Sequence, residues 1–148
     1  MRRFPTLSGD ALREKIDGAY DAFLQWRECS IEDRTGLLGQ VGELLIEQKE
    51  SLAETITQEI GKPISQSLSE IEKCAWVCQF YAMQAEGFLS PREVPTEASR
   101  SYVRYDPLGP VLAVMPWNYP FWQVFRFAAP ALAAGNVCLL KHAPNVWI

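Results

Sequence analysis

The chain has 148 residues, a formal net charge of −4 and an ordinary apolar content, which together describe one compact globular domain. Its first hundred residues hold 17 acidic against 11 basic side chains, and this balance argues against nucleic acid or an anionic membrane as a partner. The basic residues at positions 2 and 3 precede no apolar segment of the signal-peptide kind, so we expect a cytoplasmic protein.

Apolar residues recur with helical spacing through most of the first ninety positions. This spacing predicts a first helix over about residues 10–26, a second that follows it closely, and a long fourth helix over about residues 65–87. The third helix is expected to begin at a capping box formed by Ser51 and Glu54 and to stop at Gly61. The front of the chain is therefore predicted to be a helical scaffold.

The four cysteines suggest little chemistry by their spacing. Cys74 and Cys78 lie four positions apart on the predicted fourth helix and could share a metal only if other ligands converged on them. The single histidine, His142, is far away in the sequence, so we expect no metal site. None of the cysteines has a visible base partner. We therefore expect all four to serve as small apolar residues in a reducing compartment rather than as nucleophiles.

The composition changes over residues 90–97 to proline, glutamate, threonine and serine, and residues 101–105 then alternate as a strand does. A short pair of strands here would present an edge that finds no partner within the chain. Such an edge commonly pairs with another subunit, so this segment is a candidate for assembly.

Residues 111–141 are the most informative stretch of the chain. Two short apolar runs, at 111–115 and 137–141, flank a segment of helical composition at 121–134. Continuous apolar runs of this length are typical of parallel strands covered on both faces, so the stretch predicts a βαβ unit. Prolines and polar residues interrupt the stretch too often for a membrane hairpin.

Two polar residues stand at the expected carboxyl ends of these strands: Asn118 in the turn after the first strand, and Lys141 at the end of the second. Ligands of parallel α/β units bind beyond the carboxyl ends of the strands, which makes both residues candidates for function. A turn asparagine that bonds its own backbone and a solvated lysine at a strand end explain the same pattern without any function. The pattern alone leaves both interpretations open.

The order and spacing of several short motifs resemble the amino-terminal part of the aldehyde dehydrogenases. The motifs are Asp106-Pro107-Leu108-Gly109-Pro110-Val111, Pro116-Trp117-Asn118, Pro130-Ala131-Leu132-Ala133-Ala134-Gly135-Asn136 and Leu140-Lys141, with Glu59-Ile60-Gly61-Lys62-Pro63 upstream. The run Lys141-His142-Ala143-Pro144-Asn145 is most similar to bacterial succinate-semialdehyde dehydrogenases. The resemblance covers nearly the whole chain and is tightest from Tyr102 onward.

The resemblance implies a role for each polar strand end. Asn118 would form half of an oxyanion hole, because an amide donates a hydrogen bond without titrating. Lys141 would donate to the hydroxyls of the adenosine ribose of NADP or NAD, and the backbone of Met115, Pro116 and Trp117 would line the same groove.

The residues after Lys141 complete the cofactor site that the resemblance implies. They are His142, Ala143 and Pro144, and Pro144 stands where family members that prefer NAD often have a glutamate. The chain has no Gly-x-Gly-x-x-Gly turn, but the family binds its dinucleotide without one. We therefore expect NADP to be accepted at least as readily as NAD.

By this resemblance the fold class is α/β, with a helical front over residues 1–89, an oligomerisation strand arm over 90–106, and the first βαβ unit of a Rossmann-like dinucleotide-binding domain over 107–148. The domain would be incomplete, because the family's general base and nucleophilic cysteine lie beyond these positions. The implied reaction is oxidation of a small aldehyde, such as succinate semialdehyde, to the acid through a thiohemiacetal in a homo-oligomer. The isolated chain is expected to be inactive. The alternative is a non-catalytic binding or assembly module that shares the fold.

Overall fold

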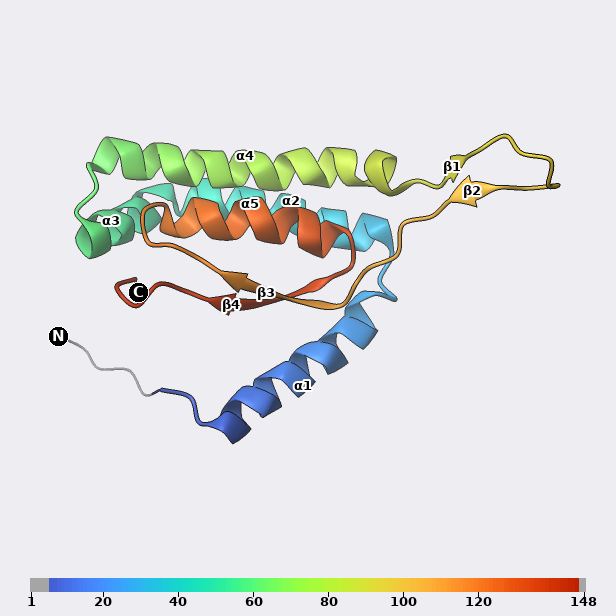
Figure 1. The fold of residues 1–148 in the computed structure, drawn as a ribbon. Helices are drawn as coiled ribbons and strands as arrows, with labels where there is room; N and C mark the ends of the chain where they lie inside the picture. The colour runs from blue at the N-terminus through green and yellow to red at the C-terminus, as the bar shows by residue number, and fades with distance from the viewer. Residues whose placement is uncertain (1–5, 147–148) are drawn as a thin grey trace.

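Residues 6–146 are described by the computed structural model, in which helices pack on a short parallel sheet (Figure 1). None of the helices in this range is both long and apolar enough to span a membrane. The predicted helical front and βαβ unit are both confirmed. The elements, in chain order, are α1 (Gly9–Trp26), α2 (Ile31–Glu47), α3 (Lys49–Ile60), α4 (Ile64–Leu89), β1 (Arg92–Glu93), β2 (Tyr102–Val103), β3 (Pro110–Val114), α5 (Pro120–Ala133) and β4 (Val137–Lys141).

The long helix α4 is the centre of the helix packing. It contacts α2, α3 and α5, and it buries Ile71 and Cys74 completely. Helix α2 approaches it closely at Gly42, where an added Cβ would lie 3.2 Å from the carbonyl oxygen of Ala75 and 3.1 Å from Cγ of Gln79. The absence of a side chain at Gly42 therefore sets how near these two helices lie.

The third helix begins earlier than the sequence analysis predicts. Gln48 alone separates α2 from α3, and it makes no side-chain hydrogen bond to the start of α3. Ser51 lies inside the helix, where its carbonyl oxygen accepts a hydrogen bond from Oγ1 of Thr55 at 3.1 Å. The predicted capping box of Ser51 and Glu54 was therefore wrong, because a cap needs an extended residue that Ser51 does not provide.

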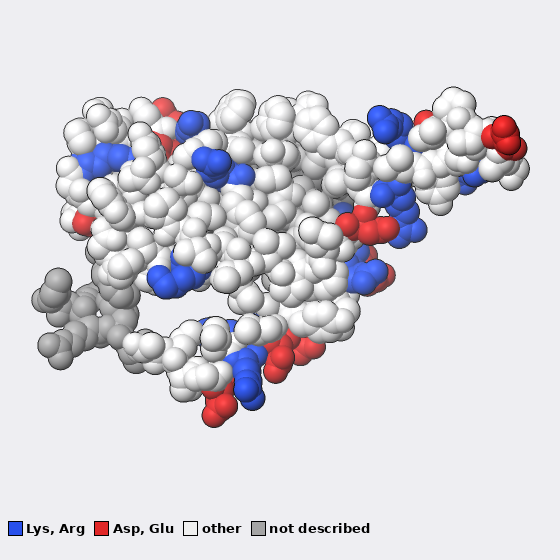
Figure 2. Space-filling view, viewed as in Figure 1, with Lys and Arg blue, Asp and Glu red and all other residues white. Residues whose placement is uncertain are grey.

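Several apolar residues of the predicted helical stripes remain exposed. Helix α1 buries Ala19 and Phe23, whereas Leu12 and Ile16 are about half exposed, at 50% and 46%. The molecule is hollowed between α1 and the layer above it, as Figure 2 shows. The apolar surface of α1 thus exceeds what the described residues cover.

Strands β3 and β4 pair in parallel, with Val114 opposite Lys141 at their carboxyl ends. Helix α5 lies over one face of this pair (Figure 1). Ala113 is buried, but Leu112 and Val114, which point to the opposite face, are 66% and 69% exposed. The parallel pairing is confirmed, and so is the uncovered apolar face expected of a sheet with only two parallel strands, because α1 contacts the strands without covering Leu112 and Val114.

A buried asparagine fixes the start of β3. Oδ1 of Asn136 accepts hydrogen bonds from the N–H groups of Leu108 at 2.7 Å and Gly109 at 3.1 Å. Gly135, just before it, has a φ of 85°, a left-handed conformation that glycine adopts without steric cost. These contacts anchor the turn before β3 to the turn before β4, so the two strands start level and their carboxyl ends meet.

Strands β1 and β2 form a hairpin in the arm, residues 90–106. They pair antiparallel, with Arg92 opposite Val103 and Glu93 opposite Tyr102, and all four residues are exposed. The arm extends away from the helices in Figures 1 and 2. Among the residues that the structure describes, this sheet has no third strand.

We predict that Gly42→Ala destabilises the chain, although alanine usually stabilises a helix interior. The added methyl group would meet a backbone oxygen of α4, and overpacking of this kind costs ~1–3 kcal/mol, more than the gain of ~1 kcal/mol in helix propensity. The matched control in the same helix is Gly36→Ala, since its added Cβ would meet no atom within 4 Å among the described residues outside its own stretch of helix. Urea unfolding should give a lower free energy of unfolding for Gly42→Ala and a higher one for Gly36→Ala. Stabilisation by both substitutions would contradict the close approach of α2 and α4.

Candidate functional site

The carboxyl ends of β3 and β4 form one edge. Val114 pairs with Lys141, and the N–H of Met115 donates to the Lys141 carbonyl oxygen at 3.0 Å. The chain then makes the turn at residues 116–119 and enters α5 at Pro120. Asn118 lies within this turn and is exposed. The topology therefore brings the Asn118 turn and Lys141 to the same edge of the sheet.

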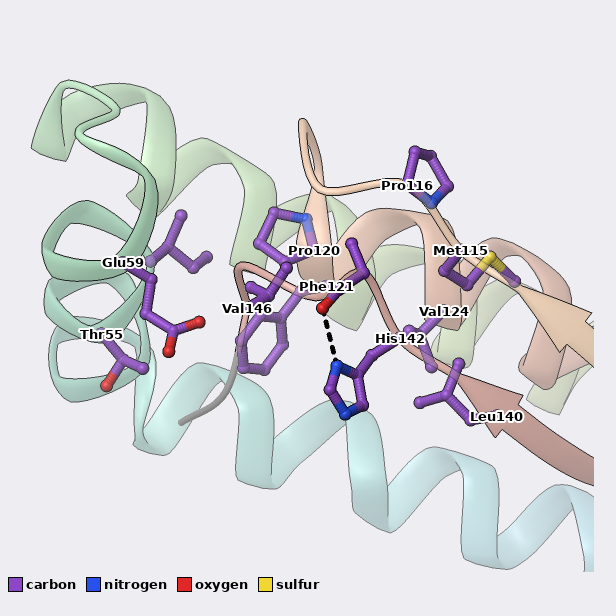
Figure 3. Close-up of a pocket in the computed structure, with 12 residues that line it drawn as sticks. Thr55, Glu59, Met115, Pro116, Pro120, Phe121, Val124, Leu140, His142 and Val146 are labelled. Atoms are coloured by element: carbon purple, nitrogen blue, oxygen red, sulfur yellow. Dashed lines mark hydrogen bonds between the residues drawn. The ribbon is translucent and has the colours of Figure 1, made fainter. Parts of the chain in front are cut away.

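A cavity of about 220 Å³ lies beside this edge, between the strand ends, the start of α5 and α3 (Figure 3). We refer to it as the strand-end pocket. Figure 3 shows the side chain of Glu59, from α3, pointing toward Phe121 and the space beside it. The residues that the strand ends contribute are Met115, Pro116, Leu140, His142 and Ala143.

A larger hollow of about 660 Å³ lies between α4 and α5 and includes the Asn118 turn. We refer to it as the helix groove. Two cationic side chains line it, Lys73 from α4 and Arg126 from α5, together with Asn118 and the hydroxyl-bearing Ser65 and Ser69. Glu70 also lines it, but both of its carboxylate oxygens accept hydrogen bonds from protein donors. The groove thus offers hydrogen-bond donors and positive charge to a small ligand that carries a carbonyl or a carboxylate group.

Glu70 is a buried carboxylate at the start of α5. Its side chain has no exposed surface, and Oε1 accepts the N–H groups of Phe121 at 2.9 Å and Trp122 at 3.0 Å. The N-cap residue of α5, Tyr119, makes no side-chain hydrogen bond to the helix. Because the amino-terminal end of a helix carries partial positive charge and unpaired N–H groups, Glu70 supplies from α4 the cap that α5 lacks.

Lys62 holds the second oxygen of this carboxylate. Its side chain is 8% exposed, its ammonium donates to Oε2 of Glu70, and the same nitrogen lies 3.7 Å from the centre of the Tyr119 ring. A buried ion pair is tolerable only when hydrogen bonds offset its desolvation, and here each carboxylate oxygen has a donor. Lys62 and Glu70 therefore hold both the first turn of α5 and the residue next to Asn118.

The other residues that the sequence analysis assigns to the site lie outside the strand-end pocket. Asn118 lines the helix groove, whereas Trp117, Lys141 and Pro144 are exposed at the same edge and line neither cavity. The ammonium of Lys141 donates to the carbonyl oxygen of His142. The predicted residues thus lie close in sequence to the strand ends but are divided between two hollows and open solvent.

The cysteines in the core are poor nucleophiles. Burial, and after it the nearby Glu70 carboxylate, raises the pKa of the Cys74 thiol, and burial raises the pKa of Cys78 to about 11. Burial also raises the pKa of Cys138. Thiols of raised pKa stay protonated at neutral pH, and only the thiolate reacts readily. Within residues 6–146 no group of three or more histidine, cysteine or acidic side chains is arranged to hold a metal ion.

Glu70, Lys73 and Arg126 line the helix groove but were not among the residues predicted from sequence. A signal for Glu70 does exist, because it follows Ser67 by three positions and precedes Cys74 by four, so it shares the buried face of α4. Arg126 is the single charged residue of the otherwise mostly apolar α5. Neither signal says which groups the side chain contacts, because those groups come from another helix.

The chain is similar to one known protein family over almost its whole length. The sequence profile described as the aldehyde dehydrogenase family matches residues 1–147. The probable NADP(+) succinate-semialdehyde dehydrogenase of Synechocystis sp. is 51% identical over 132 residues, which cover 89% of this chain and 29% of that protein. The NAD(P)+ succinate semialdehyde dehydrogenase of Escherichia coli is 41% identical, over 96% of this chain and 31% of that protein.

Solved structures of the same family share the fold. The succinic semialdehyde dehydrogenase of Streptococcus pyogenes, solved in complex with NADP+, superposes with a TM-score of 0.92 at 30% identity. The match covers 99% of this chain and 32% of that one. The chain therefore spans about a third or less of the length of the relatives that it matches.

Proposed function

The chain belongs to the aldehyde dehydrogenase family, and we propose that it is the amino-terminal part of an enzyme that oxidises succinate semialdehyde to the acid with NADP. The placement of Asn118, exposed at the carboxyl end of β3 in a groove with two cations, supports this proposal most directly. The relatives named above, which are NADP(+) or NAD(P)+ succinate-semialdehyde dehydrogenases, support the choice of substrate and cofactor. The general base and the cysteine nucleophile are assigned to the part of the enzyme that this chain does not span.

Asn118 would act on the oxygen of the aldehyde. When the carbonyl carbon is attacked, negative charge develops on that oxygen, and a donor fixed in advance stabilises it without any reorganisation. The amide of Asn118 suits this role because it is exposed in the helix groove and carries no titrating proton. The backbone around it is held by the hydrogen bonds that Glu70 accepts at the start of α5.

The charge of the helix groove supports an aldehyde that also carries a carboxylate. Lys73 and Arg126 line the same hollow as Asn118, and Arg126 is exposed. The ammonium of Lys73 lies 4.1 Å from the centre of the Trp122 ring. Because the planar fork of arginine matches a carboxylate better than an ammonium does, we assign the substrate carboxylate to Arg126.

The residues at the carboxyl ends of β3 and β4 are suited to binding NADP. Lys141 places an exposed cation at the end of β4, and Met115 and Pro116 border the apolar strand-end pocket beside it. Pro144, three positions after Lys141, brings no negative charge that would repel a 2′-phosphate. When bound, NADP supplies the acceptor for the hydride that leaves the substrate carbon.

The arm, residues 90–106, is proposed to join this protein to a second copy. All four paired residues of its hairpin are exposed, and its backbone edges are open among the described residues. Open strand edges pair readily with other chains, which favours a homo-oligomer assembled through this segment.

In the complete enzyme, Asn118→Ala should lower kcat for succinate semialdehyde by roughly two to three orders of magnitude, the usual cost of one lost oxyanion donor. The affinity for NADP, measured by fluorescence titration, should barely change. Asn118→Asp is the matched variant, because it keeps the size of the side chain and removes the amide donor, and it should be equally slow. A near-normal kcat for Asn118→Ala would leave Asn118 as a turn residue only.

Arg126→Gln should raise KM for succinate semialdehyde about tenfold or more, the loss expected for a charge-assisted hydrogen bond of ~1.5–3 kcal/mol. The values of kcat/KM for butanal, which lacks the carboxylate, should change much less. Arg13→Gln is the control, since it removes an exposed positive charge from α1, away from the helix groove. Equal losses for the charged and the uncharged aldehyde would show that Arg126 does not bind the carboxylate.

The unmutated enzyme should use NADP at least as readily as NAD, and Pro144→Glu should shift the preference toward NAD. The glutamate would repel the 2′-phosphate, and a like-charge contact across an interface costs several kcal/mol. Pro144→Gln controls for the loss of proline, and it should leave the preference nearly unchanged. The measurement is kcat/KM for both cofactors. A tenfold preference for NAD in the unmutated enzyme would rule out this interpretation of Pro144.

A further inference from the structure

The amide of Asn118 depends on its backbone for its position. No hydrogen bond joins the Asn118 side chain to another described residue, and the residue is exposed in a turn. The turn connects β3 to α5, so its course is set by where those two elements end and begin. The start of α5 is therefore the nearest structural feature that can fix the direction of this side chain.

The start of α5 is held by groups from outside the helix. Glu70, on α4, accepts the N–H groups of Phe121 and Trp122, three and four positions after Asn118. Lys62, just before α4, binds the other oxygen of Glu70 and contacts the face of the Tyr119 ring. The side chains of Lys62 and Glu70 are 8% and 0% exposed, so packing limits the freedom of both.

We propose that Glu70, oriented by Lys62, is a positioning residue for Asn118. Glu70 touches neither the aldehyde nor the cofactor in this scheme; it fixes the backbone that aims the Asn118 amide into the helix groove. The inference rests on the proposed function, because it needs Asn118 to act on the substrate oxygen. A displacement of about 1 Å at a reacting group can cost roughly a hundredfold in rate, so the bonds made by Glu70 matter to kcat.

A positioning role and a purely structural role for Lys62 and Glu70 predict different effects on kcat. Substitution of both residues by methionine distinguishes the two roles. Methionine fills similar volume, and replacing a buried ion pair by apolar residues is often neutral or stabilising. The variant Lys62→Met/Glu70→Met therefore removes the cap from α5 without leaving an unpaired buried charge. If the pair only supports the fold, this variant keeps both its melting temperature and its rate.

The complete enzyme with Lys62→Met/Glu70→Met should fold, and its kcat should fall about ten- to a hundredfold. Its KM for NADP should change by less than about threefold, because the strand-end residues remain in place. Lys62→Met/Glu70→Gln should recover most of kcat, since the amide oxygen still accepts from the two N–H groups and no buried charge is left unpaired. The control is Lys49→Gln/Glu72→Gln, which removes an exposed ion pair between α3 and α4, with its N–O distance of 3.0 Å, and should leave kcat unchanged.

The decisive comparison repeats Lys62→Met/Glu70→Met in an Asn118→Ala background. If the pair acts through Asn118, the double substitution should lower kcat by less than about twofold there, because coupled residues are not additive. An equal loss in both backgrounds, or a normal kcat in the parent background, overturns the proposal. If the methionine variant does not fold, Glu70→Asp, whose shorter side chain reaches the two N–H groups less well, provides the same comparison under the same criteria. Failure of the proposed function is seen separately, as a parent enzyme that does not oxidise the aldehyde or that is unaffected by Asn118→Ala.

Discussion

Side chains from other helices form hydrogen bonds with the free N–H and C=O groups at the two ends of α5, and the arrangement of the whole chain depends on these bonds. Glu70 of α4 accepts N–H groups of the first turn, while Nε1 of Trp26 and Nε of Arg34 donate to the carbonyl oxygens of Leu132 and Ala133 at the last turn. An anion at the amino-terminal end and a cation at the carboxyl-terminal end both oppose the helix dipole. Helix α5 has no acidic residue in its own first turn and no basic residue in its last. It is stable in place because α1, α2 and α4 surround it, and it in turn covers the sheet and begins at the candidate site.

The local pattern of the sequence was enough to predict most of the fold. The helices and the parallel pair follow from apolar spacing, and Gly61 ends α3 in the left-handed conformation expected of a helix stop. Ser51 and Glu54 have the spacing of a capping box and yet lie within α3, because α2 turns into α3 at Gln48 and leaves no extended residue for the cap. By contrast, the exposure of Leu112 could be expected, since a sheet of only two parallel strands leaves one apolar face uncovered.

Chain topology was enough to predict where the site lies, but not which side chains contact one another there. The rule that ligands bind at the carboxyl ends of parallel strands located Asn118 and Lys141 at one edge, and the pairing of Val114 with Lys141 agrees with it. The contacts of Glu70 could not be predicted, because they join a helix to residues about fifty positions later. A charged residue on the buried face of a helix indicates that some other group must bind that charge. It does not identify that partner, which only the packing of α4 against α5 defines.

The arm has a consequence for how this protein responds to proteases. Arg92 in β1, Arg100 between the two strands and Arg104 just after β2 are all exposed, so trypsin can reach the arm unless another subunit covers it. A cut there severs the covalent link between α4 and β3, but it leaves the contacts of α4 with α5, including the bonds to Glu70, untouched. The nicked halves should therefore remain together as one particle, held without a peptide bond. The two halves, produced as separate polypeptides, are then candidates for reassembly by complementation.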